Sequence, residues 1–233
     1  MSLQDDLKAL VSATFSDLWD VQQTTSVPEP VDLTLGSNHA KSLETATVLY
    51  ADLDGSTSMV DSMPWYFSAE VYKNYLRCAA LIIRSESGII TAYDGDRIMA
   101  VFTGDGKNTH AVRAAFKISY AVEYIINPAL VKQYPTSDTI VKHVIGIDTS
   151  PLHAARTGVR GDSDIVWIGR AANYAAKLTS LTAERVWITE DVYNRLNDYE
   201  RFTIAGELAW QPSIWHAMNN QRIYSSACTW TEV

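Results

Sequence analysis

Two aspartates that lie beside runs of apolar residues are the strongest chemical signal in the sequence. Asp52 ends the run Thr47-Val-Leu-Tyr-Ala-Asp52 and precedes Leu-Asp-Gly-Ser-Thr57, whose residues favour a turn and expose backbone N–H groups. Asp96 ends the tight turn Tyr93-Asp-Gly-Asp96, and an apolar run to Phe102 follows. If the two strands are neighbours, the two carboxylates come together. Paired carboxylates above a turn that can cradle phosphate suit a site for metal ions and a nucleotide.

The residues around the two aspartates predict the elements that position them. Apolar runs predict strands at 46–52 and 139–148, and a hairpin that starts at Gly88 and contains Asp96. Apolar residues at helical spacing predict helices over 66–84 and 107–127, the second ended by Pro128. The resulting order, β-α-β-β-α-β, is the ferredoxin-like arrangement. We therefore predict an α+β fold with a ferredoxin-like core and a C-terminal extension.

Weaker patterns flank this core on both sides. Residues 3–21 have amphipathic helical spacing, and residues 22–44 carry two prolines amid small polar residues. We divide the chain into an N-terminal helix and linker, 1–44, and a catalytic domain, 45–233. The N-terminal helix either packs on its own domain, the simpler interpretation, or contacts a second copy. Beyond residue 148 the patterns predict strands at 152–156, 165–168 and 185–188, helices at 169–180 and 190–196, and a strand-like tail at 199–226.

The overall composition argues against several classes of function. The chain has 233 residues and a formal net charge of −8, and an acidic surface disfavours sequence-independent nucleic-acid binding. Its two cysteines, Cys78 and Cys228, match no zinc or disulfide spacing. No apolar run reaches the roughly 18 residues of a membrane span, and the N-terminus lacks a signal pattern. We expect a soluble, cytoplasmic protein without nucleic-acid or membrane partners.

Three motifs in this order resemble the class III nucleotidyl cyclases, the adenylate and guanylate cyclase homology domain, over residues 46–207. The resemblance implies attack of a 3′-hydroxyl on the α-phosphorus of a nucleoside triphosphate and departure of pyrophosphate. It also implies two divalent cations, Mn²⁺ or Mg²⁺, held by Asp52, Asp96 and the Leu53 carbonyl. The motifs are Tyr50-Ala-Asp-Leu-Asp-Gly-Ser-Thr57, Asp94-Gly-Asp-Arg-Ile-Met-Ala-Val-Phe102 and Gly169-Arg-Ala-Ala-Asn-Tyr-Ala-Ala-Lys-Leu178.

The same resemblance implies roles for residues around the metal site. Backbone amides of Gly55, Ser56 and Thr57 would bind the triphosphate. Asn173 matches the asparagine that orients the ribose. Lys177 stands where the family usually has a transition-state arginine, so it keeps the charge but loses the bidentate fork. In the family these two residues act on the site of the opposite chain, which implies a head-to-tail homodimer with composite sites.

Departures from the family pattern concern the base that is recognised. Adenine-selecting members carry hydrogen-bonding side chains where Ala92 and Val166 stand here. A pocket narrowed by Tyr50 would favour a pyrimidine, and Arg97 could donate to a base carbonyl, which suits uracil. This combination resembles the bacterial pyrimidine cyclases of the Pycsar antiphage defence system, which make cyclic UMP or cyclic CMP. We expect UTP as substrate, with cytidylate, adenylate or guanylate cyclisation, or a degenerate nucleotide-binding domain, as alternatives.

One phosphate ligand of the family is missing from this chain. Many members use a C-terminal lysine on the β- and γ-phosphates, and residues 202–208 contain no lysine. Arg170 or Arg97 could replace that charge. Alternatively, metal ions and backbone amides suffice for the phosphates.

Overall fold

A computed structural model describes residues 2–181 and 186–231 of the chain. Its centre is a mixed sheet whose core strands are β2 (His39–Asp54), β3 (Ile89–Asp94), β4 (Arg97–Phe102) and β5 (Lys142–Val159). These strands lie in the order β3-β4-β2-β5, and helices α3 (Trp65–Ser85) and α4 (Lys107–Tyr120) connect them in a β-α-β-β-α-β sequence. This is the ferredoxin-like order, so the predicted α+β fold is confirmed.

The two faces of the sheet bury different residues because side chains alternate along each strand. Leu49, Ala51 and Leu53 of β2 join the larger core, which α3 and α4 cover. Val48, on the other face, belongs to a smaller core with Ala171, Ala172 and Ala175 of helix α6 (Arg170–Leu178). Tyr50 packs against this second core. Side chains on the α6 face of β2 are therefore the ones available for a site at its end.

Strands β2 and β5 are longer than the sequence predicts. The patterns at 139–148 and 152–156 form one strand, β5, and β2 begins at His39 rather than near residue 46. Pro151 does not break β5, because residues 44 and 45 of β2 form a bulge opposite it, a place where proline's missing N–H is tolerated. The boundary proposed between residues 44 and 45 thus lies inside β2. The division into two domains stays a prediction.

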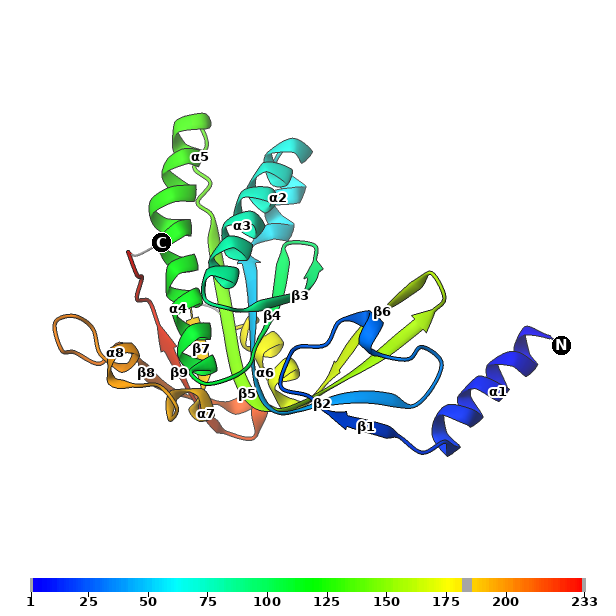
Figure 1. The fold of residues 1–233 in the computed structure, drawn as a ribbon. Coiled ribbons are helices and arrows are strands. Elements are labelled where there is room, and N and C mark those ends of the chain that lie inside the picture. The colour runs from blue at the N-terminus through cyan, green and yellow to red at the C-terminus, as the bar shows by residue number, and fades with distance from the viewer. Residues whose placement is uncertain (1, 182–185, 232–233) are drawn as a thin grey trace.

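The outer halves of β2 and β5 form an arm. Strand β1 (Asp20–Gln23) pairs in parallel with β2, and β6 (Asp162–Ile168) pairs with β5. Figure 1 shows this arm leaving the body of the molecule, with α1 (Leu3–Ser16) at its far end. The N-terminal helix is shorter than the predicted 3–21, since the chain joins the sheet at Asp20. The predicted linker is therefore partly strand.

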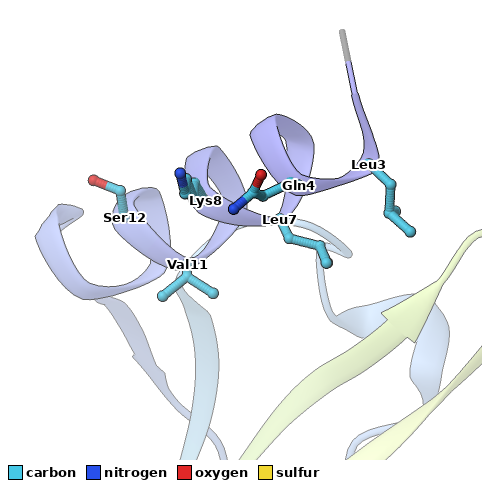
Figure 2. Close-up of a pocket in the computed structure, with 6 residues that line it drawn as sticks. All are labelled: Leu3, Gln4, Leu7, Lys8, Val11 and Ser12. Carbon is cyan, nitrogen blue, oxygen red and sulfur yellow. The ribbon is translucent and has the colours of Figure 1, made fainter.

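Helix α1 does not pack on its own domain. It has no buried residue among those described, so the simpler interpretation of the N-terminal helix is wrong. Figure 2 shows Leu3, Leu7 and Val11 along one side of the helix, where they line an open apolar hollow. The amide of Asn38 holds the end of the helix by donating to the carbonyl oxygens of Thr14 and Asp17 at 2.9 and 2.8 Å.

The helix expected to end at Pro128 continues past it. After α4, residues Ala121–Ile126 form a π-helical turn and α5 (Asn127–Gln133) follows directly. The wider turn shifts the hydrogen-bond register, and Pro128 then lies in the first turn of α5, where no backbone donor is needed. The predicted stop is therefore wrong because a change of helix type precedes the proline.

The C-terminal extension completes the sheet as β5-β7-β9-β8, with β7 (Val186–Thr189), β8 (Gln211–Trp215) and β9 (Gln221–Ser226). Helices α2 (Ser56–Ser62), α7 (Glu190–Tyr193) and α8 (Asp198–Arg201) and short 3₁₀ turns at Pro30–Asp32 and His216–Met218 complete the described elements. The first residue of the predicted strand 185–188, Arg185, lies outside the described residues. In the described part of the chain, no helix combines the length and apolar character that crossing a membrane requires.

Candidate active site

Asp52 and Arg97 form an ion pair at the end of β2. Tyr50 pairs with Met99, and Ala51 pairs with Ile98, across β2 and β4. This register brings Arg97 beside Asp52 on the α6 face. Arg97 Nη2 and Nε donate to Asp52 Oδ2 at 2.6 and 3.1 Å. The side chain of Arg97 is 35% exposed and that of Asp52 is 17% exposed, so the pair lies at a surface that a solute can reach.

Tyr50 extends the same site away from the turn. The guanidinium carbon of Arg97 lies 5.9 Å from the centre of the Tyr50 ring, within the range of a cation–π contact. Burial raises the pKa of Tyr50, and the charge of Arg97 opposes this effect. The phenol therefore stays protonated at neutral pH and can donate a hydrogen bond. Tyr50, Arg97 and Asp52 are therefore neighbours at this end of β2.

Asp96 carries a buried oxygen without a partner. Its Oδ2 atom is shielded from solvent and makes no hydrogen bond in the described structure. Such an atom is costly to bury unless a cation or donor meets it. Burial, followed by the charges of Asp52 and Asp96, raises the pKa of Tyr75 well above its ordinary value. The two carboxylates therefore act on the same buried phenol, although Asp52 lies in β2 and Asp96 in the turn between β3 and β4.

The donor set fits a divalent cation bound together with a ligand. The described residues contain no group of three or more His, Cys, Asp and Glu side chains that could hold a metal. Mg²⁺ is usually held by one or two carboxylates plus substrate phosphates rather than by a complete protein cage. Asp52 and Asp96 supply two hard oxygen ligands, and the unpartnered Oδ2 of Asp96 is the observation that favours a cation here.

The turn after Asp52 presents backbone donors at the same end of the sheet. Gly55 has φ of +75°, a left-handed conformation that suits glycine, and it is the N-cap of α2. Helix α2 begins at Ser56, so the N–H groups of Ser56 and Thr57 belong to its first turn and have no acceptor within the helix. The predicted phosphate-binding residues are thus adjacent to the carboxylates along the chain.

Asn173 and Lys177 are not brought to this site within one chain. Both are exposed on α6, and no contact in the described structure joins them to Asp52 or Asp96. Lys177 Nζ instead lies 3.7 Å from Met218 Sδ, beside β8 and β9. Those strands lie beyond β5 and β7, on the opposite side of β2 from β3 and β4. Within one chain, Asn173 and Lys177 are therefore not in contact with the two aspartates.

Arg170 is already bound to carboxylates and does not stand free as a phosphate ligand. It contacts the buried Asp148 and the half-exposed Asp191. The suggestion that Arg170 replaces the missing lysine is therefore not supported by the described contacts. Sequence reasoning overlooked Asp148, although a carboxylate that follows the apolar residues Val144 to Ile147 gives the same signal as Asp52. Tyr75 was also overlooked, because its helical spacing predicts only a core residue.

The two positions that read adenine in the family lie in different parts of the sheet. Ala92 packs, like Tyr50, against the smaller core, and it pairs with Met99, the cross-strand partner of Tyr50. Val166 lies on the arm, in β6, and is 42% exposed. Neither side chain can form hydrogen bonds with a base. In the row of side chains that contains Ala92, Met99 and Tyr50, the tyrosine hydroxyl is the one polar group.

The chain is similar over its full length to proteins named uridylate cyclase. It is 57% identical over 231 residues to the protein of Burkholderia cepacia, a match that covers 99% of this chain and 100% of the relative. Identity to the protein of Xanthomonas perforans is 48%, with 99% of each chain covered. The protein of Rhodovulum sp. (strain MB263) is 33% identical, with 97% of each chain covered.

Solved structures support the same fold. A bacterial light-regulated adenylyl cyclase superposes with a TM-score of 0.70 at 15% identity, covering 87% of this chain and 56% of that one. The guanylyl cyclase Cya2 gives 0.67 at 18% identity, covering 81% of this chain and 94% of that one. No family model matches the chain. At such low identities the structural matches show the class III cyclase fold and no more.

Proposed function

The chain belongs to the uridylate cyclases, and from this premise we propose that it converts UTP to cyclic UMP and pyrophosphate in a composite site of a homodimer. The single observation that carries the choice of site is the cluster in which Arg97 bonds Asp52 and lies over the ring of Tyr50. The name of the relatives supports the enzyme class, and the cluster supports the place where the base and the phosphates are held.

Asp52 and Asp96, with the backbone carbonyl of Leu53, would hold two divalent cations, Mn²⁺ or Mg²⁺. When bound, such cations lower the pKa of a hydroxyl and offset charge on leaving phosphates. Arg97 donates to Asp52 Oδ2, so a cation that bound this oxygen would displace the guanidinium. Its guanidinium then becomes available to the nucleotide.

The chain's own residues would bind the three parts of the nucleotide. N–H groups of Gly55, Ser56 and Thr57 would donate to the triphosphate, which fits the turn at the N-terminus of α2. Tyr50 would restrict the base pocket to a pyrimidine. Arg97, released from Asp52, would donate to a carbonyl of uracil or to a phosphate oxygen. The missing C-terminal lysine is then replaced by backbone amides and Arg97 rather than by Arg170.

The partner's helix α6 would complete the site. In our proposal Asn173 orients the ribose so that its 3′-hydroxyl faces the α-phosphorus, and Lys177 offsets charge on the phosphates in the transition state. Both lie exposed on α6, one turn apart. Cyclisation forms the bond between O3′ and the α-phosphorus and breaks the bond to the β-phosphate bridge. The hydroxyl proton leaves to solvent or a phosphate oxygen, and pyrophosphate departs.

A product assay with four nucleotides tests the proposal. Purified protein with Mn²⁺ receives ATP, GTP, CTP or UTP, and the products are identified by mass. We expect cyclic UMP from UTP, no turnover in Asp52→Ala, and increased use of purines in Tyr50→Ala. A loss of base selection of about tenfold or more is expected when a pocket wall is removed. Cyclic AMP or GMP from the unmodified chain, or turnover in Asp52→Ala, would contradict the proposal.

We also propose a role for the product as a second messenger in defence against phage. This part rests on the resemblance to pyrimidine cyclases of the Pycsar system. Bacteria that carry the native gene with its neighbours should reduce phage plating, and the Asp52→Ala substitution should remove that protection. Equal protection by the substituted and unmodified genes would refute the role without affecting the assignment of the reaction.

A further inference from the structure

Asp148 is a buried carboxylate that the proposed reaction does not use. It lies in β5 and its side chain is completely buried. Arg170 Nε and Nη2 donate to its two oxygens at 3.0 and 3.2 Å, and the hydroxyl of Thr189 donates to Oδ1. Burial raises the pKa of Asp148, while its hydrogen bonds and the charge of Arg170 oppose that effect. Because both oxygens of Asp148 accept hydrogen bonds, we infer that this side chain has a structural role.

Arg170 is the first residue of α6, and its contacts reach three separate places. Besides Asp148, its Nη2 donates to the carbonyl oxygen of Thr149 at 2.7 Å and to the carboxylate of Asp191 in α7. The backbone N–H of the next residue, Ala171, donates to Ser150 Oγ at 2.9 Å. The guanidinium of Arg170 thus joins the start of α6 to β5 and to α7. We call its paired hydrogen bonds to Asp148 the Asp148–Arg170 fork; they fix both the position and the direction of the start of the helix.

The same helix carries Asn173 and Lys177, three and seven residues after Arg170. Both are exposed, and the only polar contact of either side chain in the described structure is the long one from Lys177 to Met218. The body of α6 packs on the sheet through the small side chains of Ala171, Ala172 and Ala175, which form no hydrogen bonds. An anchor at the N-terminus of the helix therefore determines where the two exposed side chains lie.

We propose that the Asp148–Arg170 fork is a positioning pair that aims Asn173 and Lys177 at the nucleotide bound by the partner chain. The inference rests on the proposed function, because it needs Asn173 and Lys177 to act on that nucleotide. Neither Asp148 nor Arg170 touches the nucleotide. Their effect is to hold the ribose-orienting and phosphate-facing groups in one geometry during the reaction.

The chain offers a matched control for this inference. The side chain of Glu200 in α8 is also completely buried, and its carboxylate pairs with Arg113 at 2.8 Å. The two pairs have similar exposure, with 37% for Arg170 and 31% for Arg113. Glu200 lies on an element that carries none of the proposed catalytic residues. Replacing either carboxylate by its amide removes a buried charge, and Glu200→Gln therefore reports the loss of stability alone.

The experiment compares Asp148→Asn with Glu200→Gln in the full chain, at a temperature where circular dichroism shows both folded. In Asp148→Asn we expect kcat for UTP to fall by about 100-fold, the size expected for a displacement of about 1 Å, with KM changed less than threefold. Glu200→Gln should keep kcat within about twofold. Arg170→Lys, which keeps one hydrogen-bonding cation, should recover part of the rate that Arg170→Ala loses.

A mixing assay distinguishes an effect on the position of α6 from a general loss of folded protein. If Asp148 acts through α6 on the partner's nucleotide, Asp148→Asn mixed with Asp52→Asn should regain activity, because one of the two sites in the mixed dimer then has all of its groups. Equal losses of kcat in Asp148→Asn and Glu200→Gln, or no recovery on mixing, would overturn the inference. Failure of the unmodified chain to make cyclic UMP would instead overturn the proposed function, so the two failures are distinguishable.

Discussion

Arg97 makes two hydrogen bonds to one oxygen of Asp52, a residue that we propose as a metal ligand. Asp52, Asp54, Asp94 and Asp96 all lie at the same ends of β2, β3 and β4, and like charges so close together repel one another. Arg97 offsets part of this repulsion through its two bonds to Asp52 Oδ2. The guanidinium of Arg97 is thus the counter-ion of Asp52 in the nucleotide-free site. It competes with any cation for that oxygen.

Removing this counter-ion should strengthen metal binding. In Arg97→Ala, we expect the nucleotide-free protein to bind Mn²⁺ roughly fivefold more tightly, because about 1 kcal/mol of a partly exposed ion pair no longer has to be broken. Electron paramagnetic resonance of free Mn²⁺ measures the affinity directly. Arg222→Ala removes an equal charge from an exposed pair with Glu190 and serves as the control. Weaker Mn²⁺ binding in Arg97→Ala than in this control would contradict the competition.

The sequence could predict those parts of the site that lie within one short stretch of the chain, but not the contacts between separate elements. The Asp52 motif and the hairpin with Asp96 were readable because a carboxylate interrupts or adjoins an apolar run in each. The contact of Arg97 with Asp52 was not, since it depends on the register of β4 against β2. The partners of Asp148 could not be read from the sequence, because they come from α6 and β7 and no local pattern joins them.

At the scale of elements, helix α6 lies unusually close to the sheet at Gly146. A Cβ atom at this position would lie 2.2 Å from the carbonyl oxygen of Ala175 and 2.7 Å from Cβ of Leu178. Both contacts are too short to exist, and one of them is with backbone. The absence of a side chain at Gly146 is therefore what lets α6 pack directly on β5, and the height of α6 above the sheet sets the height of Asn173.

We expect Gly146→Ala to displace α6 and to lower stability. Overpacking of a tight core contact costs about 1–3 kcal/mol, and urea unfolding followed by circular dichroism measures this change. Cyclase activity should fall further than the loss of folded protein explains, because α6 carries two of the proposed groups. Ala176→Ser, a small change at a half-buried position of the same helix, is the control. An unchanged unfolding midpoint in Gly146→Ala would contradict the prediction, because it would show that α6 can move to accommodate the added Cβ atom at no cost in stability.

The order of the core elements was predictable, but several of their ends were not. Alternation and helical spacing depend on neighbours in sequence, so the β-α-β-β-α-β order could be read from the chain. The continuation of β5 through Pro151 depends on a bulge in β2, and the continuation beyond Pro128 depends on a π-helical turn. Both are properties of a partner strand or of a helix register. A proline in the sequence alone cannot reveal them.

At the scale of the whole molecule, α1 should contribute little to the stability of the body. The helix buries no residue, and a helix of about 12–15 residues is marginal in water without packing. Removal of residues 1–12, which leaves the carbonyl groups bound by Asn38, should change the free energy of unfolding by less than about 0.5 kcal/mol. Urea unfolding at two protein concentrations measures it. A larger loss would show that α1 packs on a surface, and a loss that depends on concentration would place that surface on another copy.

The separation of the proposed catalytic groups makes the dimer itself testable. Asp52 lies on the β4 side of the sheet, while Lys177 lies beside Met218 on the β9 side. One chain therefore holds two separate groups of residues, which we propose to be half-sites. A two-fold dimer brings each half-site to the complementary half of its partner, because a two-fold interface repeats every contact.

Asp52→Asn and Asn173→Ala should each be inactive alone and should recover activity when mixed. A mixed dimer has one site with both defects and one site with none, and random exchange makes about half of the dimers mixed. The expected recovery is therefore about a quarter of the unmodified rate. The measurement is the rate of cyclic UMP formation after the two proteins exchange chains, at equal total concentration. Co-purification of an untagged chain with a tagged one shows that the chains have exchanged. No recovery of activity after exchange would place all of the groups in one chain, because only a site built within a chain cannot be repaired by its partner.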